Sequence, residues 1–260
     1  MSFNDISYKL GIKLFSTNTQ LVDEAVQLVR DGVFSYIELY TPYESFNSTK
    51  DAYQFLDIPF VIHAPHFGNG VNLSDSKLRD SNRRRLEDTF QFADMLDASH
   101  IIVHGGFGGS MDELISQCTE LNDSRLVLEN IPRIGINNED CIGYSYEQLH
   151  QAVNSEAFSG MVLDIGHAVC AANAQNISWR HLITQFLSLS PVIFHLSDGY
   201  TDGLKDIHLS LGQGNFPCSD ILSVIPEQSR ITLETPRDMS HGLRDTIADR
   251  NYLQKLIVEK

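Results

Sequence analysis

Basic residues are scarce in this chain, and the cysteine spacings of disulfide-rich or thiolate-metal proteins are missing. The 260 residues include 19 lysines and arginines against 34 acidic residues, which gives a formal net charge of −15. This balance disfavours broad, nonspecific nucleic-acid binding, because such binding neutralises phosphates with Lys and Arg. The four cysteines show no CxxC spacing, which favours reduced thiols of a cytoplasmic protein.

Several segments that would indicate another class of protein are also missing. Residues 1–7 hold no basic region followed by an apolar run, so the sequence predicts no secretory signal. No apolar run is long enough to span a bilayer, and low-complexity tracts, linkers and short-period repeats are absent. With 42% hydrophobic residues, the sequence predicts one globular domain over 1–260.

Short apolar runs alternate with longer segments of helical period. The expected strands are Tyr8–Phe15, Tyr36–Tyr40, Phe60–His63, His100–His104, Arg125–Glu129, Gly160–Asp164, Val192–His195 and Ile231–Glu234. The expected helices are Gln20–Arg30, Ser76–Asp97, Met111–Leu121, Tyr146–Val153, Trp179–Leu189, Asp220–Val224 and His241–Ile257, with Thr49–Leu56 the weakest. This alternation predicts a (β/α)₈ TIM barrel. The alternative is a doubly wound open sheet, which the missing GxGxxG turn disfavours.

Six consecutive expected strands end on a residue that can bind a metal ion. These residues are His63, His104, Glu129, Asp164, His195 and Glu234. His167 follows the sixth strand, and Asp206 and His208 lie in the loop after the seventh. A single polar residue at a strand end usually just meets solvent. In a barrel, however, all these ends meet at one rim, where active sites are built. Imidazoles and carboxylates together predict a site for zinc, or for manganese or iron.

Five short stretches add a family likeness. They read Val-Leu-Glu129-Asn, Leu-Asp164-Ile-Gly-His167-Ala, His195-Leu-Ser-Asp198, Asp206-Ile-His208-Leu-Ser-Leu-Gly-Gln-Gly-Asn215 and Leu-Glu234-Thr. In order and spacing they resemble the endonuclease IV group (AP endonuclease family 2) of the xylose-isomerase-like barrels, over nearly the whole chain. The resemblance implies three zinc ions. The implied ligand sets are His63, His104 and Glu129 for the first ion; Glu129, Asp164, His195 and Glu234 for the second; and His167, Asp206 and His208 for the third.

The same resemblance implies a metal-dependent phosphoester hydrolase, in which the ions activate water for in-line attack at phosphorus. Glu129 would hold two ions together and Glu234 would orient or deprotonate the nucleophile, so these two are the expected catalytic residues. The resemblance implies abasic-site DNA as the substrate and a role in DNA repair. Because the loop after the second expected strand carries Glu44 and no arginine, a smaller phosphorylated sugar or nucleotide is the alternative substrate. His66 and Phe67 stand where the family places a DNA-probing wedge; Phe67 is expected either to enter the base stack or to cover the pocket.

A sugar isomerase or epimerase is the alternative enzyme class, and a metal-binding scaffold without activity is a third. Those isomerases typically hold one divalent ion with two Glu, one Asp and one His, which the second ligand set above supplies. Glu38 also resembles the Ile-Glu-Leu strand of that group. This interpretation has no use for His63, His104, Asp206 and His208 as ligands. Three bound ions therefore favour hydrolysis, and one favours isomerisation.

Overall fold

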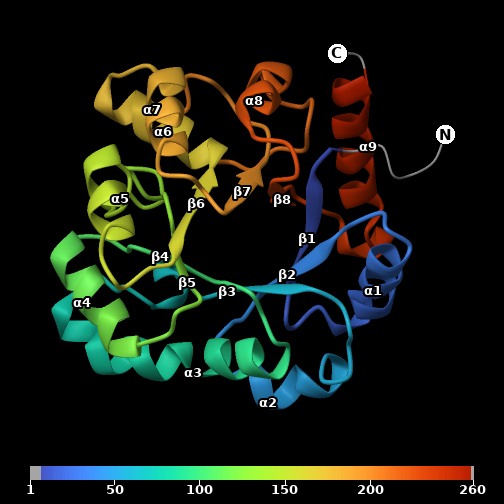
Figure 1. The fold of residues 1–260 in the computed structure, drawn as a ribbon, viewed down its shortest axis with the longest axis horizontal. Helices are drawn as coiled ribbons and strands as arrows, with labels where there is room; N and C mark the ends of the chain where they lie inside the picture. The colour runs from blue at the N-terminus through green and yellow to red at the C-terminus, as the bar shows by residue number, and fades with distance from the viewer. Residues whose placement is uncertain (1–6, 259–260) are drawn as a thin grey trace.

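Eight short parallel strands pair in sequence order and close into a barrel, as the sequence predicts (Figure 1). The computed structural model describes residues 7–258. The strands are β1 (Lys9–Phe15), β2 (Tyr36–Tyr40), β3 (Phe60–His63), β4 (Ile101–His104), β5 (Leu126–Glu129), β6 (Gly160–Asp164), β7 (Ile193–Leu196) and β8 (Arg230–Leu233). The barrel closes where β1 pairs with β8, with Gly11 beside Thr232. This closed ring excludes the open doubly wound sheet.

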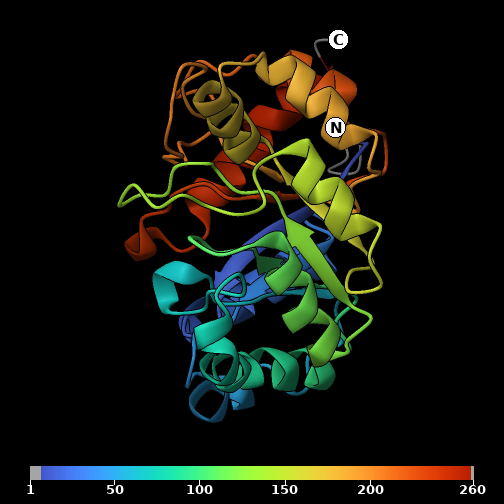
Figure 2. The same cartoon turned by 90° about the vertical axis from the view of Figure 1, so that its left-hand side faces the viewer.

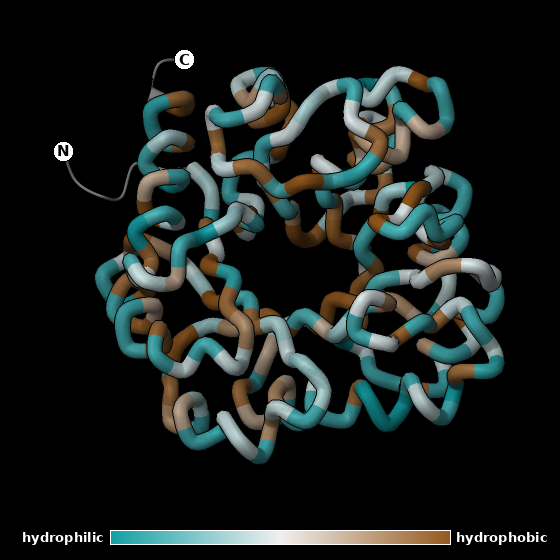
Figure 3. The backbone as a smooth tube through the Cα atoms, turned by 180° about the vertical axis from the view of Figure 1, so that it is seen from behind, coloured by the Kyte–Doolittle hydropathy of each residue, from teal (hydrophilic) through white to brown (hydrophobic). Residues whose placement is uncertain are grey.

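Helices form the outer ring around these strands (Figure 1). Their bounds are α1 (Val22–Arg30), α2 (Phe46–Thr49), α3 (Arg79–Met95), α4 (Met111–Leu121), α5 (Tyr146–Val153), α6 (Ile165–Gln175), α7 (Trp179–Leu187), α8 (Cys218–Val224) and α9 (Arg244–Val258). Short 3₁₀ segments add η1 (Thr19–Leu21), η2 (Lys50–Ala52), η3 (Phe67–Asn69), η4 (Ser76–Leu78) and η5 (Met239–His241). Hydrophobic residues gather around the central ring, and the outer turns are mostly hydrophilic (Figure 3).

Two helix predictions need correction. The sequence predicts no helix over Ile165–Gln175, yet α6 lies there. Its residues from Ile165 to Ala172 are all buried, so no polar face reveals a helical period. The expected helix Thr49–Leu56 is also wrong: α2 ends at Thr49, η2 ends at Ala52, and a turn follows. The other expected helices are present, with ends shifted by up to three residues.

The barrel interior is built in layers, because alternate residues of each strand face inward. An apolar layer inside the ring consists of Tyr36, Val61, Ile102, Val127, Val162 and Ile193. Gly11 and Thr232 continue this layer on β1 and β8; the Tyr36 hydroxyl lies 2.8 Å from Thr232 Oγ1, and a Cβ at Gly11 would lie 2.4 Å from the Tyr36 ring. A separate, larger core lies between the strands and the helices. The apolar layer therefore forms a floor beneath the strand ends.

Some sequence predictions concern properties other than the barrel. None of the helices within residues 7–258 is long and apolar enough to cross a membrane. All four cysteines are buried, and none forms a disulfide. Residues 1–6, to which the prediction of no secretory signal applies, lie outside the described part of the chain.

The long loop between β7 and α8, which carries two expected ligands, is anchored by Asp198. This buried carboxylate accepts hydrogen bonds from four backbone N–H groups, those of Gly199 (2.8 Å), Gly212 (2.8 Å), Gly214 (3.0 Å) and Phe216 (3.1 Å). Its own backbone exchanges two hydrogen bonds with Leu209. Asp198 thereby holds the loop at one end of the barrel, from which the segment after β5 and η5 also project (Figure 2).

We expect Asp198→Asn to lower the free energy of unfolding by about 2 kcal/mol or more, because hydrogen bonds to a buried charge are strong and an amide group would face the N–H donors. Urea denaturation measures the change. Asp202→Asn, at an exposed position of the same loop, is the matched control with little effect. Equal stability of the two variants would contradict this role.

Candidate metal centre

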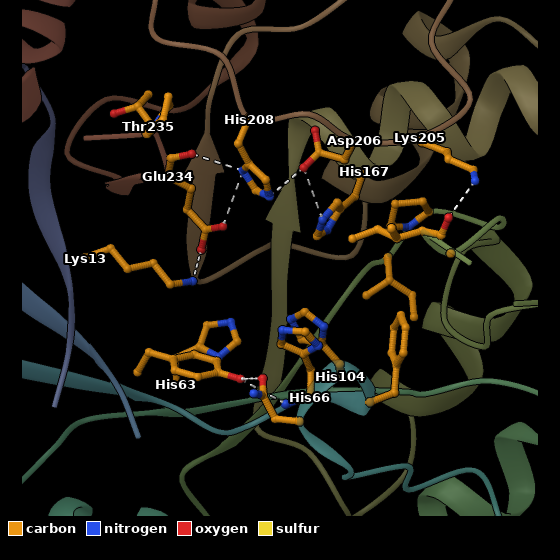
Figure 4. A pocket seen from close by; sticks show the side chains of 18 of the residues that line it. Lys13, His63, His66, His104, His167, Lys205, Asp206, His208, Glu234 and Thr235 are labelled. Atoms are coloured by element: carbon orange, nitrogen blue, oxygen red, sulfur yellow. Dashed lines mark hydrogen bonds and ion pairs between the residues drawn. The ribbon is translucent and has the colours of Figure 1, made fainter. Parts of the chain in front are cut away.

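A polar layer lies directly above the apolar floor of the barrel. It consists of the residues two positions further along the chain than each residue of the floor, which are Lys13, Glu38, His63, His104, Glu129, Asp164, His195 and, directly after β8, Glu234. His167, Asp206 and His208 approach this layer from α6 and from the loop after β7 (Figure 4). The structure thus brings all nine sequence-predicted ligands to the same end of the barrel.

Glu129 is the centre of this layer. Its fully buried carboxylate contacts four imidazoles. His63 Nε2 lies 3.2 Å and His104 Nε2 3.0 Å from Oε2. His167 Nδ1 lies 3.2 Å and His195 Nδ1 3.3 Å from Oε1. One carboxylate therefore links the histidines of β3, β4, β7 and α6, which is the arrangement that a bridging ligand needs.

Backbone carbonyls set the orientation of three histidine rings. The Nδ1 of His63 lies 2.9 Å from Ala64 O, that of His167 2.9 Å from Asn130 O and that of His208 3.0 Å from Glu234 O. A carbonyl oxygen only accepts, so each Nδ1 must donate, and a neutral ring then presents the lone pair of Nε2. Those Nε2 atoms face Glu129 or Asp206. A nitrogen lone pair and a carboxylate oxygen repel each other, and a cation between them would remove this repulsion.

His195 is oriented by a carboxylate instead. Its Nε2 donates to Glu38 Oε2 at 2.9 Å, and Thr232 donates to the same oxygen at 2.6 Å. The other ring nitrogen, Nδ1, faces Glu234 Oε1 at 2.9 Å. A carboxylate that fixes the outer nitrogen of a histidine is typical of metal sites in proteins. Glu38 is therefore placed to orient a ligand rather than to serve as one.

The arrangement fits divalent cations by a second observation. Asp164 Oδ2 is buried and has no hydrogen bond within residues 7–258. Glu129 Oε1, His195 Nδ1 and Asp206 Oδ2 likewise lack a well-aligned hydrogen bond there, although each lies within 3.3 Å of an opposing imidazole or carboxylate atom. A buried polar atom without a hydrogen bond costs about 1–3 kcal/mol. Binding of a cation satisfies such acceptors. Imidazole nitrogens and carboxylate oxygens are ligands that zinc accepts.

The ligand groups differ in part from those expected by resemblance. His63, His104 and Glu129 gather with their ligand atoms within 4.8 Å of one another, and so do His167, Asp206 and His208. The second expected set does not gather as a unit of its own. Glu234 and His195 instead group with Glu38 and His63, whereas Asp164 groups with Glu129 and His167. Within the described residues, Asp164 groups with this set through Glu129, and Glu234 joins Glu129 through His195.

Local backbone features support the third group. His208 has a φ of 44°, a left-handed conformation that is uncommon for a non-glycine residue but that histidine adopts more readily than most. A Cβ at Gly166 would lie 2.7 Å from Asp206 Oδ1, so glycine leaves the room that Asp206 needs. Asp164 caps α6 by accepting a hydrogen bond from His167 N at 2.6 Å. The cap fixes the start of α6 and therefore the position of His167 in its first turn.

Two histidines of the third group hold protons tightly. Burial by itself would lower the pKa of His167, but Asp164 and Glu129 raise it to about 10. Burial likewise opposes the charge on His208, and Asp206 beside it, 2.6 Å from Nε2, raises its pKa to about 9. When no metal ion is bound, protons on these rings supply the positive charge that the carboxylates require. For Asp164 the balance is opposite, since burial raises its pKa to about 6.

Sequence analysis missed two pocket residues. Lys13 lies in the polar layer, with Nζ in ion pairs to Glu234 and, at 3.1 Å, to Glu38. Its signal was a lysine at an inward-facing position in the middle of a strand whose neighbouring residues are apolar. Arg237 lies in the irregular segment after β8, where no periodicity points to it. Of the residues left open, His66 and Phe67 line the same pocket, and the His66 ring stacks on His104 at 5.4 Å.

Comparison with known proteins supports the fold. A sequence profile described as a xylose isomerase-like TIM barrel matches residues 24–256. Endonuclease IV from Thermus thermophilus has a TM-score of 0.71 at 20% identity, covering 97% of this chain and 100% of that one. A D-tagatose 3-epimerase-like protein gives 0.71 at 20%, covering 96% and 97%. An uncharacterised Methanocaldococcus jannaschii protein is 22% identical over 228 residues, 80% of this chain and 72% of that protein.

Zinc binding to the metal-free protein should release protons at neutral pH. The raised pKa values of His167 and His208, about 10 and 9, mean that both rings are protonated at pH 7, and zinc needs them neutral. Affinity at the third group should therefore rise as the pH increases from about 7 towards 9. Titration calorimetry in buffers of different ionisation enthalpy measures the release. Heats that do not depend on the buffer would contradict it.

Glu38→Gln should weaken zinc binding about 10- to 100-fold, the usual cost of losing a carboxylate that orients a histidine ligand. The variant keeps the volume of Glu38 but removes the charge that faces His195 and Lys13. Competition with a chelator measures the affinity. Glu147→Gln, at an exposed position on α5, is the control. Unchanged affinity in Glu38→Gln would rule out the orienting role.

Proposed function

The chain belongs to the xylose isomerase-like TIM barrel family, and from this premise we propose that it is a metal-dependent phosphoester hydrolase with three divalent ions. Zinc fits the ligands best, and manganese or iron are compatible with them. The observation that carries the proposal is the third ligand group. His167, Asp206 and His208 gather beside Glu129, with the rings of both histidines held in fixed orientation by backbone carbonyls, and a one-metal isomerase site has no use for them.

Each proposed ligand has a place in this scheme. His63, His104 and Glu129 would hold the first ion, and His167, Asp206 and His208 the third. Glu129, Asp164, His195 and Glu234 would hold the second, with Glu129 shared. Divalent ions there would supply Lewis-acid stabilisation for the charge that develops on the phosphate oxygens, and would make water a stronger nucleophile at neutral pH.

The residues around Glu234 support its proposed catalytic role. Its Oε1 contacts both Lys13 and His195 Nδ1, and this fixes the orientation of the carboxylate. Oε2 stays 3.9 Å from His208 Nδ1 and is free to accept a proton or orient a water molecule. Lys13 also balances part of the negative charge of Glu234 and Glu38. Glu129 has a different role, since its contacts are with the four histidines.

A small phosphorylated sugar or nucleotide is better supported as the substrate than abasic DNA. Phe67 lines the pocket and packs edge-on against Phe107 at 5.6 Å, which suits a cover more than a wedge. Arg79, the first basic residue of α3, is paired with Glu113 at 2.7 Å and with Glu120, so it is not free for phosphates. The net charge of −15 also disfavours a long phosphate backbone.

A sugar isomerase or epimerase is the second candidate. The observation in its favour is the buried pairing of Lys13 with Glu38 and Glu234, which places acid–base groups beside a possible one-metal set. Similarity in fold to a D-tagatose 3-epimerase-like protein is compatible with this candidate. Under this proposal, one ion would be held by Glu129, Asp164, His195 and Glu234.

Metal counting combined with a phosphodiester assay separates the two candidates. We expect metal-free protein to take up three zinc ions and to hydrolyse bis(p-nitrophenyl) phosphate. His104→Ala should lose one ion and at least about a hundredfold in kcat/KM, because a charge-stabilising group is removed. His150→Ala, exposed on α5, is the control. Three bound ions without turnover of any phosphoester would refute the hydrolase, and one ion with isomerase activity would support the second candidate.

A further inference from the structure

Arg237 lines the pocket, and only one of the two terminal nitrogens of its guanidinium has a hydrogen bond to the described part of the protein. Its Nη2 donates to the backbone carbonyl of Lys13, which fixes the plane of the group. Its Nη1 is buried and has no hydrogen-bond partner anywhere in residues 7–258. Burial lowers the pKa of Arg237, and Asp245 opposes that effect only in part. A buried donor on a charged group without an acceptor is costly, and an anionic ligand would supply the missing acceptor.

The place of Arg237 points to a substrate rather than to the protein interior. It lines the same cavity of about 660 Å³ as His63, His104, His167 and Glu234. Its Nη2 is anchored at the backbone of Lys13, whose Nζ reaches Glu234. Arg237, Lys13 and Glu234 all line this one cavity. One small molecule can therefore touch both Arg237 and the ligand cluster.

The cavity has the size and walls of a small-molecule site. A volume of about 660 Å³ lies within the usual range for ligand pockets. Phe15, Ile131 and Met239 give it apolar walls. The loop after β5 is tied to the loop after β7 by Lys205 Nζ, which donates to Ile136 O at 2.6 Å, and both residues line the cavity. These walls suit an organic body between two charged ends.

We propose that Arg237 forms an oxyanion subsite, which binds a second phosphate or carboxylate group of a small substrate whose reacting phosphate lies at the metal cluster. A planar guanidinium matches both kinds of oxyanion, through two parallel N–H donors. This subsite rests on the proposed function in one respect: the metal ions at the ligand cluster must bind the first phosphate. The substrate class is then a small molecule with anionic groups at both ends.

Binding of matched phosphonates to the zinc-loaded protein tests this subsite without turnover. Propylphosphonate has one anionic end, whereas 3-phosphonopropionate and propane-1,3-bisphosphonate carry a second, a carboxylate or a phosphonate. We expect calorimetry to show about tenfold tighter binding or more for at least one of the two doubly anionic ligands, the usual gain from a charge-assisted hydrogen bond. The stronger of the two identifies the preferred oxyanion. Equal affinity for all three ligands would overturn the proposal.

Substitutions at Arg237 test whether this residue causes the preference for doubly anionic ligands. Arg237→Gln should reduce the preference to less than about twofold, and Arg237→Lys should retain part of it because the charge remains. Arg244→Gln removes the same charge from an exposed position outside the cavity and should leave the preference unchanged. A preference that survives in Arg237→Gln overturns the proposal. If Arg237→Gln does not fold, the wild-type comparison and Arg237→Lys decide.

The two proposals fail in different ways. A protein that prefers the doubly anionic ligands but hydrolyses no phosphoester would refute the hydrolase and leave the oxyanion subsite standing. A protein that hydrolyses phosphodiesters but shows no preference would retain the hydrolase and refute the subsite.

Discussion

The contact of one buried carboxylate, that of Glu129, with four histidine rings is the interaction on which the rest of the site depends. Glu129 has no exposed surface, and burial of its charge without partners would be prohibitive. His195 and His104 hold its pKa well below its usual range, so the group stays ionised. The strand ends can therefore converge only if positive charge is supplied among them. When no metal ion is bound, protons on His167 and His195, whose pKa values are raised, supply it, and divalent cations would replace them.

The surrounding residues orient the ligand atoms so that divalent cations can replace the protons on the histidine rings. Backbone carbonyls orient His63, His167 and His208, and Glu38 orients His195, so the ligand atoms face inward before any ion arrives. Preorganisation of this kind reduces the cost of binding. The Asp198 anchor keeps the long loop after β7 in place. Rigid strands carry most of the ligands, and an anchored loop completes the third group.

The Arg237 subsite and the ligand cluster divide the pocket into two charged ends with apolar walls between them. An acidic protein can offer such a pocket to a bisanionic molecule, because what matters is the local charge at the mouth rather than the net charge. Loops shape this pocket, whereas strands shape the ligand cluster. In this family fold, variation of substrate is expected to arise from the loops.

Much of this protein was determined by its sequence alone. The alternation of strands with helices specified the barrel, and the period of two along each strand placed the ligand residues in one layer. The same period along β1 and β2 also points to Lys13 and Glu38. Of these two, the sequence analysis named only Glu38, for its resemblance to the isomerase strand. Helix α6 was not predicted, because its uniform burial leaves no polar face that would reveal a helical period.

Tertiary structure decided what no period encodes. Which ring nitrogen of each histidine faces inward depends on carbonyls such as Ala64 O and Glu234 O, whose positions follow from how the chain turns after each strand. The sharing of Glu129 by four rings depends on closure of the barrel, which brings β3, β4 and β7 around β5. Arg237 belongs to an irregular segment, and only the packing of that segment against β1 gives its guanidinium a fixed place in the pocket.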